Sequence, residues 1–515
     1  MTSNYIKLLA LLFVFASCSK DDTLIENDNT SNDNTVQKEL LTVLEINSKI
    51  DQILLKNNDF NWTDADDYML WSAVVHGNNI LTIGYGKENE SFSEQFSKRL
   101  SNTKQDILDM ISRTEGVKFD KNKKENIVDY EIINVVDVKV EHLETIMALR
   151  KAKNIRYLEP NGYNKYVSKN AINQSGKQNK SILSTLGCST ASETINPAHY
   201  QNVSPNNAQV AWNFYKHNIP QAWNISTGRG VTIGLIDTGV SAQQSLLNTS
   251  GFNDGVSNGR QVEKIGTFID SPWWWSRNND GPHDKCGHGT QMASTIASPR
   301  NDDGMPVGVA YNSNLVAYRA TEDVVLNDYH ERKGVSQALI ELGNRQDVKI
   351  ISMSIGWTWT VGNIKDAVKY ANSKGKLIIA AGGTSTNFTN WYGVTFPATM
   401  SETVAVTGVD DGVNYKRCDI CHSGSKIDFT IIMEGNNDTS KHPPVLGFNN
   451  GQRVYTGGSS TATATVAGIA ALIWAKHPNW NKNQVLNKLK QSADLYPNKS
   501  NQFGYGNIDA LKAVQ

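Results

Sequence analysis

Hydrophobic residues gather in short continuous runs in the second half of the chain. Residues 231–236, 348–353 and 377–381 are largely apolar, which is typical of strands buried on both faces. Residues 335–343 and 364–373 instead place their apolar side chains at helical spacing. This alternation of buried strands with amphipathic helices predicts an α/β fold in which helices flank a parallel sheet.

Residues 39–165 have a different pattern, which predicts a small α+β domain. Strands at residues 68–75 and 80–85 are expected on either side of the turn His76-Gly77-Asn78-Asn79. The remaining expected elements are a helix at 92–111, a strand at 136–140, a helix at 141–153 and a strand at 155–158. The second half of this domain is therefore predicted to run strand, helix, strand.

Two segments lack such periodicity. Residues 18–38 are polar and rich in Asn and Asp, which predicts a disordered tether. Residues 166–195 are rich in Ser, Asn, Lys and Gln, which predicts an exposed linker of the kind that proteases cut. We therefore expect the small domain at 39–165 to be joined by this linker to a large domain at 196–515.

The chain begins with a segment typical of export signals. One lysine precedes an apolar run at residues 8–15, which is too short to span a bilayer as a stable helix. Small residues then lead to Cys18. This arrangement resembles the lipobox of bacterial lipoproteins, and it implies a signal peptide at 1–17, lipidation of Cys18, and a protein anchored in the membrane at the cell envelope or surface. The alternative is an ordinary signal peptide with an incidental cysteine.

The composition is that of a folded protein. Hydrophobic residues make up 39% and charged residues 20% of the chain, so a sizeable core is expected. The formal net charge of −1 gives no electrostatic reason to expect a nucleic acid partner.

Four cysteines remain once Cys18 is set aside, and they allow three pairings. In an exported protein disulfides are favoured, and we favour one between Cys188 and Cys286, although the sequence does not decide the pairing. Cys418 and Cys421 form a Cys-Asp-Ile-Cys motif that also suits redox or zinc chemistry. Because a second such pair is missing from the sequence, a four-ligand zinc site is disfavoured.

Three segments of the large domain carry residues suited to nucleophilic catalysis. Asp237 follows a buried strand, His288 lies between two glycines at the start of a helix of small residues, and Ser460 begins an Ala-rich helix. The start of a helix favours a developing anion. Each residue also has a plain structural interpretation: a capping Asp, a structural His, and a Ser that caps its helix, a role that Ser459 fills equally well.

Together, the three segments resemble the subtilisin-like serine proteases, or subtilases. The resemblance rests on Asp-Thr-Gly at 237–239, His-Gly-Thr at 288–290, Gly-Ser-Ser at 458–460 and Val-Ala-Gly at 466–468, and on the chain order Asp, His, Ser. It covers residues 211–515 and implies a subtilisin-like fold and a monomeric endopeptidase acting on protein or peptide substrates. Asp237 would orient the imidazole, His288 would act as the general base, and Ser460 would be the nucleophile.

The same resemblance assigns a substrate-binding strand to residues 351–356, where backbone groups of Ser354 and Gly356 would pair with an extended peptide. Trp357 and Trp359 would line a specificity pocket or simply pack.

Gly383 stands where the family has the Asn of the oxyanion hole. Thr384, Asn387 or a water would have to replace that donor, together with the Ser460 N–H. Two further departures from the family pattern are Ala464 in place of a Pro and Gln291 in place of a second His.

No cofactor is required by this chemistry. Calcium is commonly bound in the family, and the turn Asn301-Asp302-Asp303 could supply oxygen ligands near Asp302; the alternative is an ordinary Asp/Asn turn without a metal. The run Trp273-Trp274-Trp275 would grip a surface if exposed, or anchor its loop if packed.

The small domain resembles an inhibitory propeptide over residues 136–161, and residues 157–161 would lead a strand into the active-site cleft. Such a propeptide is itself a partner of the protease until autocleavage in the linker. Two other functions compete with a general endopeptidase. Gly383 is compatible with a binding or scaffold lipoprotein on a degenerate protease fold, and also with a processing protease that has one dedicated substrate.

Overall fold

The computed structural model describes residues 39–57, 59–92, 97–118, 127–165, 187–204, 207–384 and 393–515. Its contacts divide the chain into two units, Met1–Leu40 and Leu41–Gln515. The expected signal peptide, Cys18, the tether and residues 166–186 of the expected linker lie outside the described residues. Both predicted folded domains lie in the second unit.

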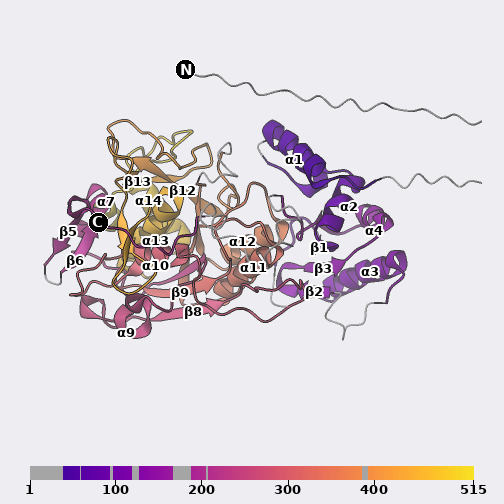
Figure 1. Ribbon diagram of the computed structural model, residues 1–515, viewed down its shortest axis with the longest axis horizontal. Helices are drawn as coiled ribbons and strands as arrows, with labels where there is room; N and C mark the ends of the chain where they lie inside the picture. The colour runs from indigo at the N-terminus through magenta and orange to yellow at the C-terminus, as the bar shows by residue number, and fades with distance from the viewer. Residues whose placement is uncertain are drawn as a thin grey trace, which may run out of the picture. The chain divides into compact units, whose positions relative to one another are not determined.

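A parallel sheet of seven strands forms the centre of the larger part, in the order β13-β12-β11-β10-β7-β9-β8 (Figure 1). The strands are β7 (Thr232–Asp237), β8 (Val262–Gly266), β9 (Asn314–Arg319), β10 (Val348–Met353), β11 (Leu377–Ala381), β12 (Thr403–Asp410) and β13 (Phe429–Glu434). This architecture confirms the predicted α/β fold.

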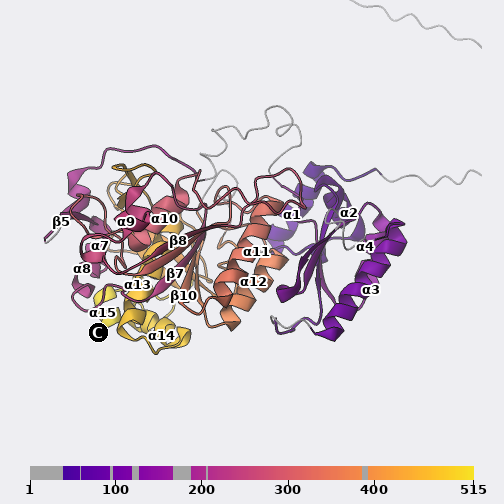
Figure 2. The ribbon, with the colours of Figure 1, turned by 90° about the horizontal axis from the view of Figure 1, so that it is seen from below.

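Helices cover both faces of the sheet, as Figure 2 shows. On one face lie α10 (His288–Ala297), α13 (Gly458–Lys476) and α14 (Lys482–Ser492), and on the other lie α11 (Tyr329–Asn344) and α12 (Gly362–Ser373). Of the described helices, α13 is the one long and apolar enough to cross a bilayer, but 89% of its apolar window is buried in the protein. It is therefore best understood as the central core helix.

Shorter elements complete this part of the chain. They are α7 (Trp212–Lys216), α8 (Ile219–Ala222), α9 (Thr249–Phe252), α15 (Ala510–Val514), the hairpins β5 (Tyr200–Val203)–β6 (Ala208–Ala211) and β14 (Pro444–Leu446)–β15 (Arg453–Tyr455), and the 3₁₀ turns η3 (Pro197–His199), η4 (Ser245–Leu247) and η5 (Gly255–Ser257).

The smaller part has an antiparallel sheet of four strands in the order β2-β3-β1-β4. Its elements are α1 (Val43–Asn57), η1 (Trp62–Asp64), α2 (Asp67–His76), β1 (Ile80–Tyr85), α3 (Lys98–Glu115), β2 (Ile127–Tyr130), η2 (Glu131–Ile133), β3 (Val135–Lys139), α4 (Leu143–Lys151) and β4 (Ile155–Glu159). The predicted succession of strand, helix and strand is confirmed by β3, α4 and β4. Helix α3 begins later than predicted because the Ser97 side chain caps it at Leu100 N.

The strand predicted at residues 68–75 is wrong, because this segment is helix α2. The Asp66 side chain accepts a hydrogen bond from Met69 N at 2.8 Å and so caps the helix. The buried residues include Met69, Leu70, Ala73 and Val74, a spacing that gives one helical face. An apolar run of this length fits a strand or a helix, and the cap decides between them.

Candidate active site

The site is built at the carboxyl end of strand β7 and the start of helix α10. Asp237 is the last residue of β7 and is fully buried, and His288 is the first residue of α10. The His288 ring Nδ1 lies 2.8 Å from Asp237 Oδ1. Gly287, just before His288, has a φ of +98°, and a methyl group there would lie 2.1 Å from Ser189 O. Only glycine therefore fits at this position.

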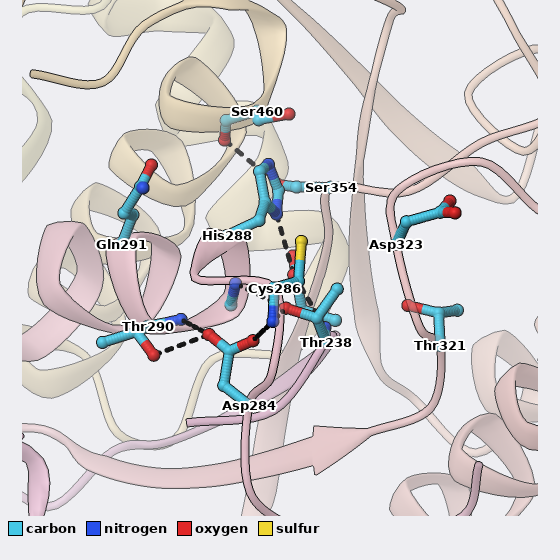
Figure 3. A network of polar contacts seen from close by, with 12 residues as sticks. Thr238, Asp284, Cys286, His288, Thr290, Gln291, Thr321, Asp323, Ser354 and Ser460 are labelled. Carbon is cyan, nitrogen blue, oxygen red and sulfur yellow. Dashed lines mark hydrogen bonds and ion pairs between the residues drawn. The ribbon is translucent and has the colours of Figure 1, made fainter. Parts of the chain in front are cut away.

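A second buried carboxylate, Asp284, holds the start of α10 in place (Figure 3). Its Oδ1 accepts hydrogen bonds from Thr238 Oγ1, Cys286 N and Gly287 N, and its Oδ2 accepts from Thr290 N and Thr290 Oγ1, at 2.6–3.0 Å. Thr238 Oγ1 in turn accepts from Gly289 N at 2.9 Å. Asp284 is not among the residues predicted from the sequence. The available signal was an Asp four residues before the His, at the start of a helix.

The charges around His288 favour its protonated form. Burial lowers the pKa of His288, but the nearby carboxylate of Asp237, helped by Asp284 and Asp323, outweighs burial and raises the net pKa above 6.5. The Nδ1 position beside the Asp237 carboxylate carries the ring proton. Nε2 is therefore the nitrogen left to exchange a proton with a substrate or a nucleophile.

Ser460 is the third residue of α13 and lines the same cleft as His288. The cleft has a volume of about 330 Å³. The backbone carbonyl of Ser460 accepts a hydrogen bond from Ser354 Oγ at 3.0 Å. Within the described residues the Ser460 hydroxyl itself makes no hydrogen bond. The structure thus brings His288 and Ser460 to one cleft, and His288 and Asp237 into direct contact.

The expected substrate-binding strand lines the cleft from Ser354 to Trp357. The backbone of Gly356 is already paired, because Gly356 N donates to Val324 O and Leu326 N donates to Gly356 O, both at 3.0 Å. Trp357 is buried and lines the cleft. Trp359 packs away from the cleft, with its ring 4.9 Å from that of Trp357 and 5.7 Å from that of Phe60.

At the expected oxyanion position, Gly383 has a φ of +123° and its N–H donates to Ser459 Oγ at 3.2 Å. Thr384 lines the cleft, and its hydroxyl is hydrogen-bonded to Ser459 Oγ at 2.8 Å. Gln291 also lines the cleft. Asn387, the other expected donor, lies outside the described residues.

Comparison with known proteins identifies the family. Residues 228–506, more than half of the chain, match the model of the subtilase family of S8 peptidases. The chain belongs to the subtilase family. It is accordingly a subtilisin-like serine protease, a hydrolase.

Among its relatives, the subtilase is 31% identical over 284 residues to subtilisin DY of Bacillus licheniformis, covering 54% of this chain and 88% of that protein. It is 29% identical over 307 residues to a thermostable alkaline protease of Halalkalibacterium halodurans, covering 59% of this chain and 74% of that protein. The crystal structure of fervidolysin from Fervidobacterium pennivorans, a keratinolytic enzyme related to subtilisin, has the same fold, with a TM-score of 0.56, 17% identity, and coverage of 85% of this chain and 61% of that one.

A segment at the start of the larger part of this subtilase reaches the cleft at one residue and is tied to the residues around it. Gly187 lines the cleft, and Cys188 forms a disulfide with Cys286, two residues before His288. Further along, Glu193 Oε2 accepts a hydrogen bond from Tyr455 N at 2.7 Å, and Asn196 N donates to Tyr455 Oη at 2.8 Å. The disulfide confirms the favoured pairing of Cys188 with Cys286. Cys418 and Cys421 form the second disulfide.

The smaller part contacts helices α11 and α12 through buried polar groups. Asp366 Oδ2, on α12, accepts from Arg156 Nη1 at 2.6 Å and from Tyr157 Oη at 2.7 Å. Glu159 Oε2 accepts from Gly362 N, at the first turn of α12, at 2.8 Å. Arg332 Nη1, on α11, donates to Asn161 O at 2.9 Å. Strand β4 and the residues after it are thus fixed to the protease part by charge-assisted hydrogen bonds.

The three consecutive tryptophans differ in their exposure to solvent. Trp274 is buried and packs with Tyr329, Ile80 and Val128. The Trp273 side chain is 59% exposed, and its ring lies 5.0 Å from that of Trp275. Trp274 thus anchors the loop against β1 and β2 of the smaller part.

In the turn expected to bind calcium, some of the side-chain oxygens already accept hydrogen bonds. Asp302 is exposed, and the Asn301 amide donates to Asp254 Oδ2 at 3.0 Å and to Asp303 Oδ2 at 2.8 Å. In the described ranges, no three or more His, Cys, Asp or Glu residues are grouped to hold a metal. Calcium binding near Asp302 stays a prediction from the sequence, and no catalytic step proposed below depends on it.

Proposed function

We propose that this subtilase is an exported, lipid-anchored serine endopeptidase in which Asp237, His288 and Ser460 form the catalytic triad. The observation that carries the proposal is the 2.8 Å contact between His288 Nδ1 and Asp237 Oδ1 in a cleft that Ser460 also lines. A carboxylate at Nδ1 fixes the ring so that Nε2 is available as a base.

In the proposed reaction, Ser460 Oγ attacks the carbonyl carbon of the scissile peptide bond and its proton passes to His288 Nε2. The Asp237 carboxylate stabilises the imidazolium that forms. The C–N bond then breaks, the leaving amine takes the proton from Nε2, and an acyl-enzyme remains on Ser460. Water, deprotonated by His288, hydrolyses this ester and restores the free enzyme.

Stabilisation of the oxyanion is the weaker part of this machinery. Gly383 supplies no side-chain donor, so the backbone N–H groups at the start of α13 would carry most of the developing charge. In subtilisin, removal of the corresponding Asn costs about 10²–10³ in turnover. This observation favours a second candidate, a processing protease that cuts itself and one dedicated partner, for which slow turnover suffices.

We further propose that residues 39–165 are an inhibitory propeptide and that the linker is cut by the protease itself. The buried contacts of Asp366, Gly362 and Arg332 with the smaller part support this proposal. Export and lipidation of Cys18 rest on the sequence of residues 1–18 alone. The substrate would be a protein or peptide, and the protein would be monomeric.

A fluorophosphonate probe tests the nucleophile. The wild type should be labelled and Ser460→Ala should not, whereas Ser459→Ala, the matched neighbour, should keep its labelling. Equal labelling of Ser460→Ala and the wild type would remove the assignment. If neither the wild type nor Ser460→Ala is labelled and the chain stays uncut, the result would favour a binding or scaffold lipoprotein on a degenerate protease fold.

Intact mass and N-terminal sequencing of wild type and Ser460→Ala test the rest of the proposal. The wild type should begin within residues 166–195 and Ser460→Ala should retain its propeptide. Both precursors should carry a lipid on Cys18. A peptide library then separates the general endopeptidase from the processing protease, since only the former should cut many unrelated peptides.

A further inference from the structure

The strand expected to receive a substrate is closed along one edge by another part of the same chain. Ser354 lies beside the proposed nucleophile, because its hydroxyl donates to Ser460 O at 3.0 Å (Figure 3). Two residues further on, Gly356 N donates to Val324 O and Leu326 N donates to Gly356 O, both at 3.0 Å. The two segments form a parallel bridge at Gly356, which is the contact that an added peptide strand would otherwise make.

The opposite edge of this strand is occupied as well. Trp357 N donates to Phe396 O at 2.9 Å, and Phe396 N donates to Trp357 O at 3.0 Å. Because backbone groups of successive residues face alternate sides of a strand, Ser354 faces the same side as Gly356. Within the described residues the Ser354 backbone makes no hydrogen bond. A peptide can therefore pair with this strand at Ser354 but finds no open edge beyond it.

A buried carboxyl group holds both ends of the closing loop, residues 322–328. Glu331, in the first turn of α11, is 1% exposed. Its Oε1 accepts a hydrogen bond from Glu322 N at 3.2 Å, and its Oε2 accepts from Asn327 N and Asp328 N at 3.1 Å each. One side chain thus replaces the strand partners that the loop would otherwise need for these backbone groups.

The middle of the loop is held by two further side chains. Asp323 Oδ1 accepts a hydrogen bond from Val325 N at 2.7 Å. Arg332 Nε, one residue after Glu331, donates to Leu326 O at 3.1 Å. These partners all belong to the larger part of the chain. The hydrogen bonds that shape the loop therefore do not require residues 39–165.

The closed edge limits how much of a substrate this strand can bind. A peptide that pairs with Ser354 would reach Gly356 with the residue two positions further along, and the loop already holds that place. Two backbone hydrogen bonds, worth about tenfold in kcat/KM, are therefore not available to a longer substrate.

We propose that residues 322–328 are a built-in strand that replaces the substrate beside Gly356, with Glu331 as its positioning residue. The protease then recognises only the few substrate residues next to the scissile bond on this side, paired at Ser354. This inference rests on the proposed function, and it adds what the site recognises: a short stretch of sequence rather than a long extended peptide.

Hydrogen exchange tests whether the edge is closed, and it does not depend on catalysis. In the autoprocessed wild type, or in the full chain if that stays uncut, the amides of Leu326 and Gly356 should exchange at least about tenfold more slowly than unbonded amides. Exchange as fast as that of unbonded amides would overturn the proposal. Loss of the proposed function would be recognised separately, because Ser460 would then not react with the fluorophosphonate probe.

A pair of variants tests the positioning role of Glu331. Glu331→Gln keeps one acceptor oxygen and loses the other, so it should speed the exchange of the Leu326 and Gly356 amides. Glu341→Gln is the control on the same helix, where Glu341 accepts from Tyr318 Oη at 3.0 Å, and it should leave their exchange unchanged. Equal exchange in the two variants would overturn the role of Glu331. If Glu331→Gln does not fold, the wild-type measurements still decide whether the edge is closed.

Peptide length tests the consequence for substrates. The probes are synthetic peptides centred on the first bond that the wild type cuts in oxidised insulin B chain, with two or four residues on each side of that bond. Lengthening the side that pairs with Ser354 should change kcat/KM by less than about threefold, whereas Glu331→Gln should gain about tenfold from the same extension. A gain of about tenfold or more from lengthening each side of the wild-type substrate would overturn the proposal. If the B chain is not cut, the exchange measurement decides.

Discussion

The ring of His422 occupies the space into which a side chain at residue 383 would project. A methyl group on Gly383 would lie 2.4 Å from His422 Nδ1, well inside any normal contact. His422 Nδ1 donates to Gly393 O at 2.8 Å, and burial lowers the pKa of His422 to about 4. His422 is therefore neutral at pH 7, and its Nε2 is an acceptor with no partner among the described residues. It does not replace the missing oxyanion donor.

The first prediction concerns this position. Gly383→Asn should lower the melting temperature and leave kcat/KM no higher than in the wild type. The new side chain meets His422, and a φ of +123° strains any residue other than glycine. Gly393→Asn is the control variant, because a side chain at residue 393 meets open space. It should keep the melting temperature of the wild type. A stable Gly383→Asn variant with kcat/KM raised about a hundredfold would contradict this prediction.

The second prediction concerns the pH dependence of the nucleophile. His288 must be deprotonated to act as a base, and the nearby carboxylates raise its pKa above 6.5. The rate of fluorophosphonate labelling should therefore fall as the pH drops through a midpoint above 6.5. Asp237→Asn should react more slowly, by up to about 10⁴, and its midpoint should move to lower pH. An unchanged midpoint in that variant would show that Asp237 does not set the basicity of His288.

The third prediction concerns how tightly the proposed propeptide is held. Burial raises the pKa of Glu159 from 4.5 to about 7 in the assembled protein, and burial also raises the pKa of Asp137 and Asp366. These groups bind protons in the assembled state that they release when exposed. The association is therefore strongest below about pH 4.5 and weakens as the pH rises through about 7.

Size-exclusion chromatography of autoprocessed wild type should show more propeptide co-eluting with the protease at about pH 5 than at about pH 8. Glu159→Gln keeps an acceptor for Gly362 N and should flatten this dependence. Glu144→Gln, an exposed change in the same domain, should not. A propeptide that is retained equally at both pH values would remove the role of Glu159.

The fourth prediction compares the two disulfides. Cys188–Cys286 spans 98 residues and Cys418–Cys421 spans 3, so chain entropy predicts stabilisation of about 4–5 and about 2 kcal/mol respectively. In the Ser460→Ala background, replacing the first pair by serines should lower the urea midpoint of unfolding more than replacing the second. The reverse order would mean that packing around Cys418 and Cys421 outweighs loop closure.

The sequence predicted the central strands well, and the reasons are local. Strands β10 and β11 have the predicted bounds, because continuous apolar runs of this length leave little choice of structure. Helix α11 begins at Tyr329, earlier than the predicted residue 335. Its first turns bury Glu331, which accepts hydrogen bonds from Asn327 N and Asp328 N just before the helix, and Arg332, which donates to the distant Asn161 O. Apolar periodicity does not reveal such residues.

The site was predictable only in part for the same reason. Short motifs located Asp237, His288 and Ser460, and the structure places His288 beside Asp237 and in one cleft with Ser460. Asp284 was missed because only the fold brings it to Thr238, 46 residues earlier in the chain. The glycine at residue 383 was visible in the sequence, but its contact with His422 was not, since His422 is 39 residues further along the chain.

The segment from Cys188 to Asn196 matters for how this protein is produced in the laboratory. A recombinant fragment that starts at residue 228, where the family match begins, would leave Cys286 as an unpaired thiol beside His288 and would strip Glu193 and Asn196 from Tyr455. Such a fragment would retain every family motif and yet lose Gly187 from the lining of its cleft and the contacts of Glu193 and Asn196 with Tyr455. Production of this protease should therefore start upstream of Cys188 and take place under oxidising conditions.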